Sequence, residues 1–353
     1  MHPADGGTPC IARPGFNRMS EANELTARPR PPAIYWGVAL ALAAVLLYYS
    51  LRGIAWLRVW VILRGASLPI VGLAVAVMSF NLLMRSLRWR VVLSAERRVA
   101  ASQAFWSTAA GYLGNNVLPA RAGELVRTLT ICARTGMSKV FVLTTIFAER
   151  IVDAMFVLAI SGVILLSLPN APGWLKSAAR PVGLVGLGGV AAIVLIPIFE
   201  NFWLRLLALA PVPHRWRDAA EHVLRHVIQG VRSLHHFGRL TRFLSFTALI
   251  WSLDGVITVL GGRAIGVPFS FSVAFLLIAG LGLGSALPST PGYVGIYQFV
   301  AVSVLAPFGF SQADAIAYIL LFQAMNYVVL VIWGLLGLSR LRRSSAAGPN
   351  NGT

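Results

Sequence analysis

Charged residues are scarce in this sequence, and their scarcity decides which solvent the chain meets. Of its 353 residues only 12% are charged, 57% are hydrophobic, and the mean hydropathy is +0.73. A soluble globular chain is about a quarter charged. This composition excludes a soluble enzyme or a soluble binding domain, and it predicts an all-α polytopic membrane protein.

Acidic residues and cysteines are also few. The chain has 12 acidic and 30 basic residues, a net charge of +18 that comes almost wholly from arginine. In so apolar a chain this excess indicates cytoplasmic loops and contact with anionic lipid, and not nucleic acid. The two cysteines, Cys10 and Cys132, have no CxxC spacing and predict neither a metal site nor a disulfide framework. We therefore expect no metal and no cofactor.

Long polar runs are confined to the two ends of the sequence. Residues 1–32 are rich in Pro, Gly and Arg and lack the apolar stretch of a cleaved signal peptide, so we expect a disordered cytoplasmic N-terminus. Residues 341–353 are expected to form a disordered tail. Between them, residues 33–340 are predicted to form one transmembrane domain.

Apolar runs of about 20 residues, the length of helix that crosses a bilayer core of roughly 30 Å, recur along this domain. We expect about eight hydrophobic helical segments. They are 33–50, 67–85, 139–167, 181–199, 243–262, 268–287, 293–307 and 313–338. Residues 52–64 mix Arg with Trp and Leu and are predicted to lie at the membrane interface. Residues 203–242, rich in Arg, are predicted to form a cytoplasmic amphipathic segment on anionic lipid.

The arginines of the short loops predict the orientation. They place both termini on the cytoplasmic side of a bacterial inner membrane, although Arg52, Arg58 and Arg64 run against the rule. Residues 98 and 134 are then both inside, and the segment between them is too short for two full spans. We therefore expect a re-entrant helix–break–helix element with its break at Pro119, buried by protein or lining a wet cavity.

A second break resembles the first. The stretches "VLPARAGEL" and "ALPSTPGYV" are alike in form, and the second is predicted to enter the membrane from the opposite side. Two interrupted segments with opposite entry predict an inverted repeat with a site near the midplane of the bilayer. The alternative is that 268–307 is two short spans. The predicted break residues are Pro119, Gly123, Pro288, Pro291, Gly292 and Gly295.

The stretch "AERIVD" places charge inside a predicted span. Glu149, Arg150 and Asp153 are three or four residues apart and share one helix stripe. A charge at the bilayer centre costs at least roughly 2.5–3.5 kcal/mol, so such residues face the bundle interior. They form either a buried pair that locks two helices or part of a site for a polar substrate. Their surplus negative charge is matched by an arginine of the first break or removed by protonation.

The first break carries Arg121, Glu124 and Arg127, which recur every three residues. Arginine presents a planar fork of donors that suits phosphate, and a half-helix N-terminus offers free N–H groups to an anion. A phosphate-bearing head group is the ligand that this pattern favours. The alternative is that the arginines sit at the cytoplasmic interface and only follow the positive-inside rule.

Other polar residues give weaker signals. Asp254 is a lone acid within a predicted span and has no partner that the sequence names. Gln298 and Gln323 are equally explained as hydrogen bonds between helices. Arg85 and Arg88 are interpreted as ordinary anchors at the end of the second span.

The three motifs together resemble a known family. "NNVLPARAGELVR", "ERIVD" and "LPSTPGYVGIYQ" are similar to the lysylphosphatidylglycerol synthase transmembrane region, or flippase-like, family, over residues 33–340. The resemblance implies about eight membrane helices and a role in moving or presenting lipid-linked substrates. The full synthases carry a soluble aminoacyl-transfer domain after the membrane part. The sequence shows none after Arg343, so we expect the translocating function without synthase activity.

These observations favour a lipid translocator that binds an anionic lipid or a lipid-linked head group at the paired breaks, and they favour a transporter over an enzyme. The predicted binding residues are Asn115, Asn116, Arg121, Glu124, Arg127, Glu149, Arg150, Asp153, Asp254 and Gln298. One alternative is an integral-membrane lipid-modifying enzyme or glycosyltransferase, with Glu149 and Asp153 as acid and base. Another is a non-catalytic accessory protein of a hopanoid or glycolipid pathway, with lipid-biosynthesis enzymes as partners.

Overall fold

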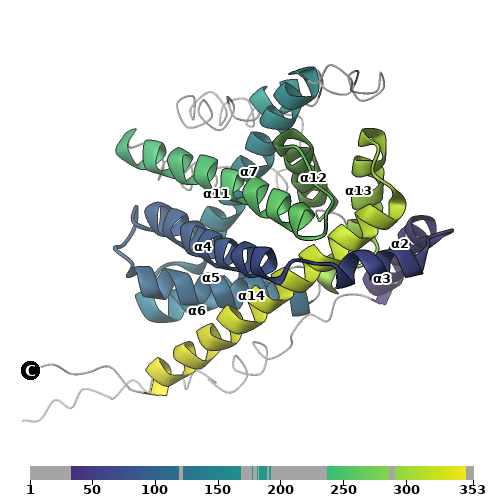
Figure 1. Ribbon diagram of the computed structural model, residues 1–353. Helices are drawn as coiled ribbons and strands as arrows, with labels where there is room; N and C mark the ends of the chain where they lie inside the picture. Colours follow the sequence, from purple (N-terminus) through teal and green to yellow (C-terminus); the bar gives the residue numbers. More distant parts are fainter. Residues whose placement is uncertain are drawn as a thin grey trace, which may run out of the picture.

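The fold is helical wherever the structure, a computed structural model, describes the chain. The described residues are 33–118, 122–167, 237–285 and 291–346, with 183–188 and a few single positions beside it, and none of them forms a strand (Figure 1). The predicted N-terminus, most of the predicted span 181–199, and residues 203–236 of the predicted amphipathic segment lie outside these ranges. The all-α prediction is confirmed.

The helices follow the predicted segments closely. They are α2 (Ala33–Leu51), α3 (Trp56–Arg64), α4 (Leu68–Leu93), α5 (Ala101–Val117), α6 (Gly123–Thr135), α7 (Lys139–Ser167), α11 (Phe237–Ala264), α12 (Phe271–Gly284), α13 (Ile296–Leu305) and α14 (Gln312–Ala346). Two 3-10 turns complete the second half, η2 (Pro291–Tyr293) and η3 (Ala306–Phe308).

Three helix ends differ from the prediction. α4 runs to Leu93 instead of residue 85, so the arginines near its end belong to the helix body. α11 begins at Phe237, which makes the last part of the predicted amphipathic segment part of a membrane helix. α14 continues to Ala346, past residue 341 where we expected the tail to begin.

Among the residues that the structure describes, four helices are long and apolar enough to cross a bilayer: α4, α7, α11 and α14. The pair α2–α3 passes the same test as a unit, but its two parts are bent by 86°. This bend separates the first apolar segment from the Trp- and Arg-bearing helix α3, which was predicted to lie at the interface. The chain is thus a multi-pass membrane protein.

The helix order repeats. A long helix, a pair of short helices and a second long helix occur as α4, α5–α6, α7 and again as α11, α12–α13, α14. The packing repeats as well, because α5 contacts α14 of the other half and α12 contacts α7 in the same way. The described residues therefore contain an internal two-fold repeat.

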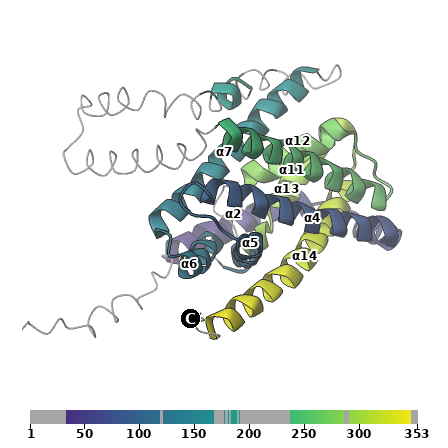
Figure 2. The ribbon, with the colours of Figure 1, turned by 90° about the vertical axis from the view of Figure 1, so that its left-hand side faces the viewer.

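The first helices of the two halves, α4 and α11, lie side by side along their length (Figures 1 and 2). Near one end the Ser67 amide donates to the Ala264 carbonyl over 2.7 Å, and near the other Arg88 donates to the Thr247 hydroxyl over 3.1 Å. Residue numbers rise along one helix as they fall along the other, so the pair is antiparallel. Equivalent helices that run in opposite directions are what an inverted repeat requires.

Each pair of short helices is a tight hairpin. A Cβ on Gly111 would lie 2.8 Å from the Cβ of Arg127, and one on Gly114 would lie 2.8 Å from the Cα of Gly123, so only glycine lets α5 and α6 approach this closely. In the second hairpin a Cβ on Gly284 would lie 2.9 Å from the side chain of Ile296. Small residues at such contacts are the usual means of close helix packing in membranes.

The arms of the second hairpin are too short to span a membrane alone. α12 has 14 residues and α13 has 10. At 1.5 Å per residue these are about 21 and 15 Å, against a hydrocarbon core of roughly 30 Å. These lengths favour the helix–break–helix interpretation of 268–307 over two short spans.

The second break is bent by left-handed backbone. Gly292 has φ 74° and Gly295 has φ 91°, a region that side chains with a Cβ rarely adopt. The N–H of Gly295 donates to the side chain of Gln298 in the first turn of α13. Pro119 and Pro288 lie outside the described residues.

Candidate functional site

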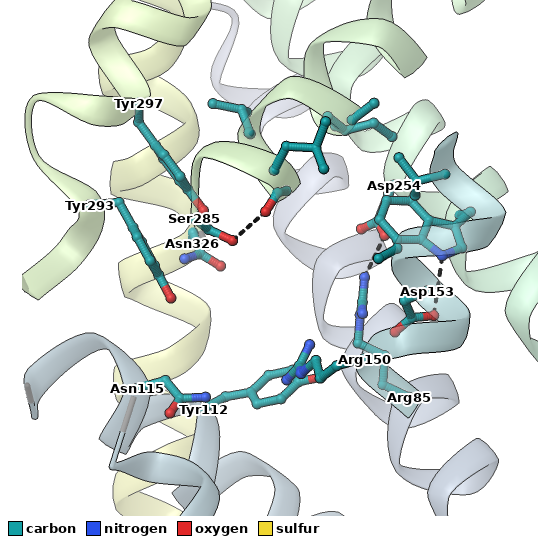
Figure 3. Close-up of a pocket in the computed structure, with 18 of the residues that line it drawn as sticks. Arg85, Tyr112, Asn115, Arg150, Asp153, Asp254, Ser285, Tyr293, Tyr297 and Asn326 are labelled. Atoms are coloured by element: carbon teal, nitrogen blue, oxygen red, sulfur yellow. Dashed lines mark hydrogen bonds and ion pairs between the residues drawn. The ribbon is translucent and has the colours of Figure 1, made fainter. Parts of the chain in front are cut away.

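A cavity of about 530 Å³ lies between the two hairpins and the long helices. Its lining combines charged, amide and aromatic side chains from both halves of the repeat (Figure 3). The polar and aromatic lining residues are Arg85, Tyr112, Asn115, Asn116, Glu124, Phe147, Arg150, Asp153, Trp251, Asp254, Ser285, Tyr293, Tyr297, Phe322 and Asn326. The volume falls within the range of about 300–1,000 Å³ found for small-molecule sites.

One ion pair on the cavity wall joins the first hairpin to α7. Arg150 donates to Glu124 over 2.9 Å, and the Arg150 side chain keeps 36% of its surface exposed. Asn115, on the other arm of the hairpin, donates to the same Glu124 oxygen over 3.2 Å. Glu124 is thus held at the first turn of α6, where negative charge is favoured by the helix dipole.

A second ion pair on the wall joins α4 to α11. Arg85 donates to Asp254 over 2.5 Å, and Asn81 donates to the other oxygen of Asp254 over 2.6 Å. The side chains of Arg85 and Asp254 are 17% and 20% exposed. Asp254 therefore has two partners that the sequence did not name, and the interpretation of Arg85 as an ordinary anchor is wrong.

A buried network of charges lies beneath this wall. Arg88 donates two hydrogen bonds to the carboxylate of Asp153, over 2.5 and 2.8 Å, and its Nε lies 3.4 Å from a carboxylate oxygen of Glu149. Arg127 donates to the second oxygen of Glu149 over 3.0 Å. These four side chains are between 2% and 8% exposed. The network ties α4, α6 and α7 together.

Aromatic rings complete the surroundings of this network. The guanidinium carbon of Arg127 lies 3.8 Å from the centroid of the Trp89 ring, a cation–π geometry. The Trp89 N–H donates to the Thr145 hydroxyl over 3.2 Å. Arg88 lies over the ring of Phe243, with its guanidinium carbon 5.1 Å from the centroid. The interface interpretations of Arg88 and Arg127 are therefore wrong, since both are buried among aromatic rings and carboxylates.

The charges of the ion pairs on the cavity wall and of the buried network beneath it balance. Four arginines are matched by four carboxylates, namely Arg85, Arg88, Arg127 and Arg150 with Glu124, Glu149, Asp153 and Asp254. The surplus negative charge predicted for α7 is matched by Arg88 and Arg127 and needs no protonation. Charges paired in this way can lie inside a membrane protein at an acceptable cost.

The remaining predicted site residues have different places. Asn116 lines the cavity, and its amide donates to the Tyr112 carbonyl over 3.0 Å. Gln298 is buried away from the cavity and donates to Gln323 over 2.8 Å, while Gln323 donates to the Gly292 carbonyl. The geometry of Gln298 therefore fits the interpretation that it forms a hydrogen bond between helices. Arg121 lies outside the described residues, and its role in the site stays a prediction.

Several lining residues were missed from the sequence, above all Tyr293 and Tyr297. A usable signal did exist. In each break a glycine stands four residues after the proline of Leu-Pro. The residue after that glycine lines the cavity in both halves, as Glu124 in the first and Tyr293 in the second.

Within the described ranges no three metal-binding side chains gather, so the geometry offers no metal site there.

Comparisons with known proteins place this arrangement in context. Residues 36–334 match the family model described as the lysylphosphatidylglycerol synthase TM region. A curated relative, glycosyltransferase AglD of Haloferax volcanii, is 26% identical over 358 residues. That match covers 88% of this chain and 55% of the relative, so the chain spans about half the relative's length.

Proposed function

This chain belongs to the lysylphosphatidylglycerol synthase TM region family, and we propose that it binds the phosphate-bearing head group of a lipid in the cavity and carries it between the leaflets. The observation that supports this most is the presence of Arg85 and Arg150 on the wall of a cavity lined by membrane helices. We place the protein in the bacterial inner membrane with both termini in the cytoplasm.

The two wall arginines have the chemistry that phosphate needs. Each guanidinium carries five N–H donors, and Arg85 and Arg150 each bind a carboxylate through Nη2. The donors not engaged by Asp254 or Glu124 suit the oxygens of a phosphate. Arg121, predicted in the same break, would add positive charge, which a bound phosphate requires because the described charges already balance.

The buried carboxylates favour binding over catalysis. A general base must be free to take a proton from the substrate. Glu149 and Asp153, the predicted acid and base of the enzymatic alternative, are instead engaged by Arg88 and Arg127 and are nearly inaccessible. The inverted hairpins, by contrast, provide the kind of architecture that alternating access uses.

Transport in proteoliposomes tests the proposal. Purified protein is reconstituted with a fluorescent phosphatidylglycerol, and the fraction of probe that reaches the outer leaflet is followed by its reduction with dithionite. Arg150→Gln is expected to slow translocation about tenfold or more, because a charge-assisted hydrogen bond contributes about 1.5–3 kcal/mol. The matched control is Arg58→Gln, since Arg58 is 59% exposed and pairs with Asp314 outside the cavity.

Equal rates for Arg150→Gln, Arg58→Gln and the parent would overturn the phosphate site. Arg150→Lys, which keeps the charge, should retain part of the activity and so separates loss of binding from loss of fold.

A second candidate function is favoured by the printed name of the relative, a glycosyltransferase. Conversion of a lipid acceptor into a new product by the purified protein in detergent would support an enzyme. Capture of lipid-biosynthesis enzymes without any lipid movement would support an accessory protein.

A further inference from the structure

Two stacked tyrosines form a wall of the cavity across from the ion pairs. The ring centroids of Tyr293 and Tyr297 are 4.8 Å apart and their planes differ by 9°. Both side chains are partly exposed and line the cavity. Figure 3 shows them along one side, with Arg85, Asp153 and Asp254 on the opposite side. The cavity therefore has one charged wall and one aromatic wall.

The backbone is bent to hold the first of these rings in place. Tyr293 has φ 58° and is the one non-glycine residue with a positive φ in the part of the chain that the structure describes. A bulky residue in this region is strained by an amount of order 1–3 kcal/mol, and such strain persists where the surroundings impose it. Gly292 precedes it with φ 74°, and the hydroxyl of Tyr327 fills the space that a Cβ there would need.

Uncharged polar groups accompany the aromatic wall. Ser285 and Asn326 lie beside Tyr297, and Asn115 lies near Tyr112 (Figure 3). A side-chain amide offers both donors and an acceptor, and a hydroxyl offers both as well. An acyl chain needs none of these groups, whereas a ligand rich in hydroxyls needs both kinds.

We infer that the head group carries a sugar ring, which stacks on the Tyr293–Tyr297 pair while its phosphate lies at Arg85 and Arg150. The face of an aromatic ring is negative and attracts the positive C–H groups on one face of a sugar. The amides are placed for the hydroxyls at the edge of the ring. The substrate class is thus a lipid-linked phosphosugar, and this inference rests on the proposed phosphate site.

Two probes that differ only in the sugar test the inference. They are citronellyl phosphoglucose and citronellyl methyl phosphate, which are both phosphodiesters with one negative charge and the same apolar tail. Their dissociation constants are measured by calorimetry on the full chain, in a detergent whose head group is not a sugar. The parent protein is expected to bind the phosphoglucose about tenfold more tightly, the amount expected from one aromatic stacking contact with its hydrogen bonds.

The variants then assign the preference to the tyrosines. Tyr297→Leu should bind both probes with the affinity that the parent has for citronellyl methyl phosphate. Tyr297→Phe keeps the ring and should keep the preference, which also shows that the position tolerates substitution. Arg150→Gln should weaken both probes by a similar factor.

Two results would overturn the inference while leaving the phosphate site intact. One is equal affinity of the parent for the two probes, and the other is an undiminished sugar preference in Tyr297→Leu. Failure of the parent to bind citronellyl methyl phosphate at all would instead contradict the proposed function.

Discussion

Replacement of Arg88 by methionine removes the centre of the buried charge network and keeps an unbranched side chain in place of the aliphatic part of arginine. In the parent, Arg88 makes two hydrogen bonds to Asp153 and lies 3.4 Å from Glu149. After the change Asp153 retains only the indole N–H of Trp251, 3.3 Å away, among its described hydrogen-bond donors. Loss of one partner of a buried ion pair costs about 3–5 kcal/mol, so the free energy of unfolding should fall by that amount.

The measurement is the free energy of unfolding in mixed micelles, obtained by titration with a denaturing detergent. The matched control is Arg58→Met, because Arg58 is 59% exposed, lies 3.5 Å from Asp314 and should lose only about 0–1 kcal/mol. The double variant Arg88→Met/Asp153→Asn removes both members of the pair and leaves Glu149 with Arg127. It should be less destabilised than the sum of the single variants by at least about 2 kcal/mol. A cost for Arg88→Met no larger than that of Arg58→Met would refute this reasoning.

Two further changes test the packing of the first half, with the same unfolding assay. Gly114→Ala puts a methyl group 2.8 Å from the α6 backbone and should lower the free energy of unfolding by about 1–3 kcal/mol. The control is Gly72→Ala, where nothing lies within 4 Å of the new methyl group, and it should be neutral or slightly stabilising. Equal effects of the two changes would contradict the close approach of α5 and α6. Trp89→Phe removes an indole hydrogen bond and weakens the contact with Arg127, for a loss of about 1–2 kcal/mol, while Trp56→Phe on the exposed face of α3 should change little.

The helices and the two hairpins could be predicted from the sequence because membrane helices are specified locally. A run of apolar residues is helical in lipid whatever it packs against, since every backbone group must be satisfied within the segment. Pro119 and Pro288 interrupt two such runs in the same way. The ends of α4 and α14 were less predictable, because arginine near the end of a span is equally compatible with an interface and with a continuing helix.

The partners of the charges could not be predicted, because they depend on packing between distant segments. Arg88 and Asp153 are separated by 65 residues, and Arg85 and Asp254 by 169. From the sequence, an arginine one turn past the apolar run has the pattern of an anchor. Only the tertiary contact between α4 and its neighbours makes it a buried ion-pair partner.

The two halves use one geometry with different chemistry. In each, the second arm of the hairpin is tied to the long helix that follows it. The first half uses the ion pair of Arg127 and Glu149, and the second uses the amide pair of Gln298 and Gln323. An amide hydrogen bond contributes about 0.5–1.5 kcal/mol, whereas separation of a buried ion pair costs about 3–5 kcal/mol. The tie of the first hairpin is therefore more sensitive than that of the second to the loss of one partner.

The same division extends to the cavity wall. The residue that follows the glycine of the break is Glu124 in the first half, where it orients Arg150, and Tyr293 in the second, where it stacks on Tyr297. An arginine that must present free N–H groups to phosphate needs a fixed carboxylate beside it, and the first hairpin supplies one in Glu124, which Asn115 also binds. A flat aromatic surface needs no charged support, so an uncharged hairpin is sufficient to carry it. A charged wall and an aromatic wall that face each other across one cavity are thus the arrangement that a head group with a charged and an uncharged part would require.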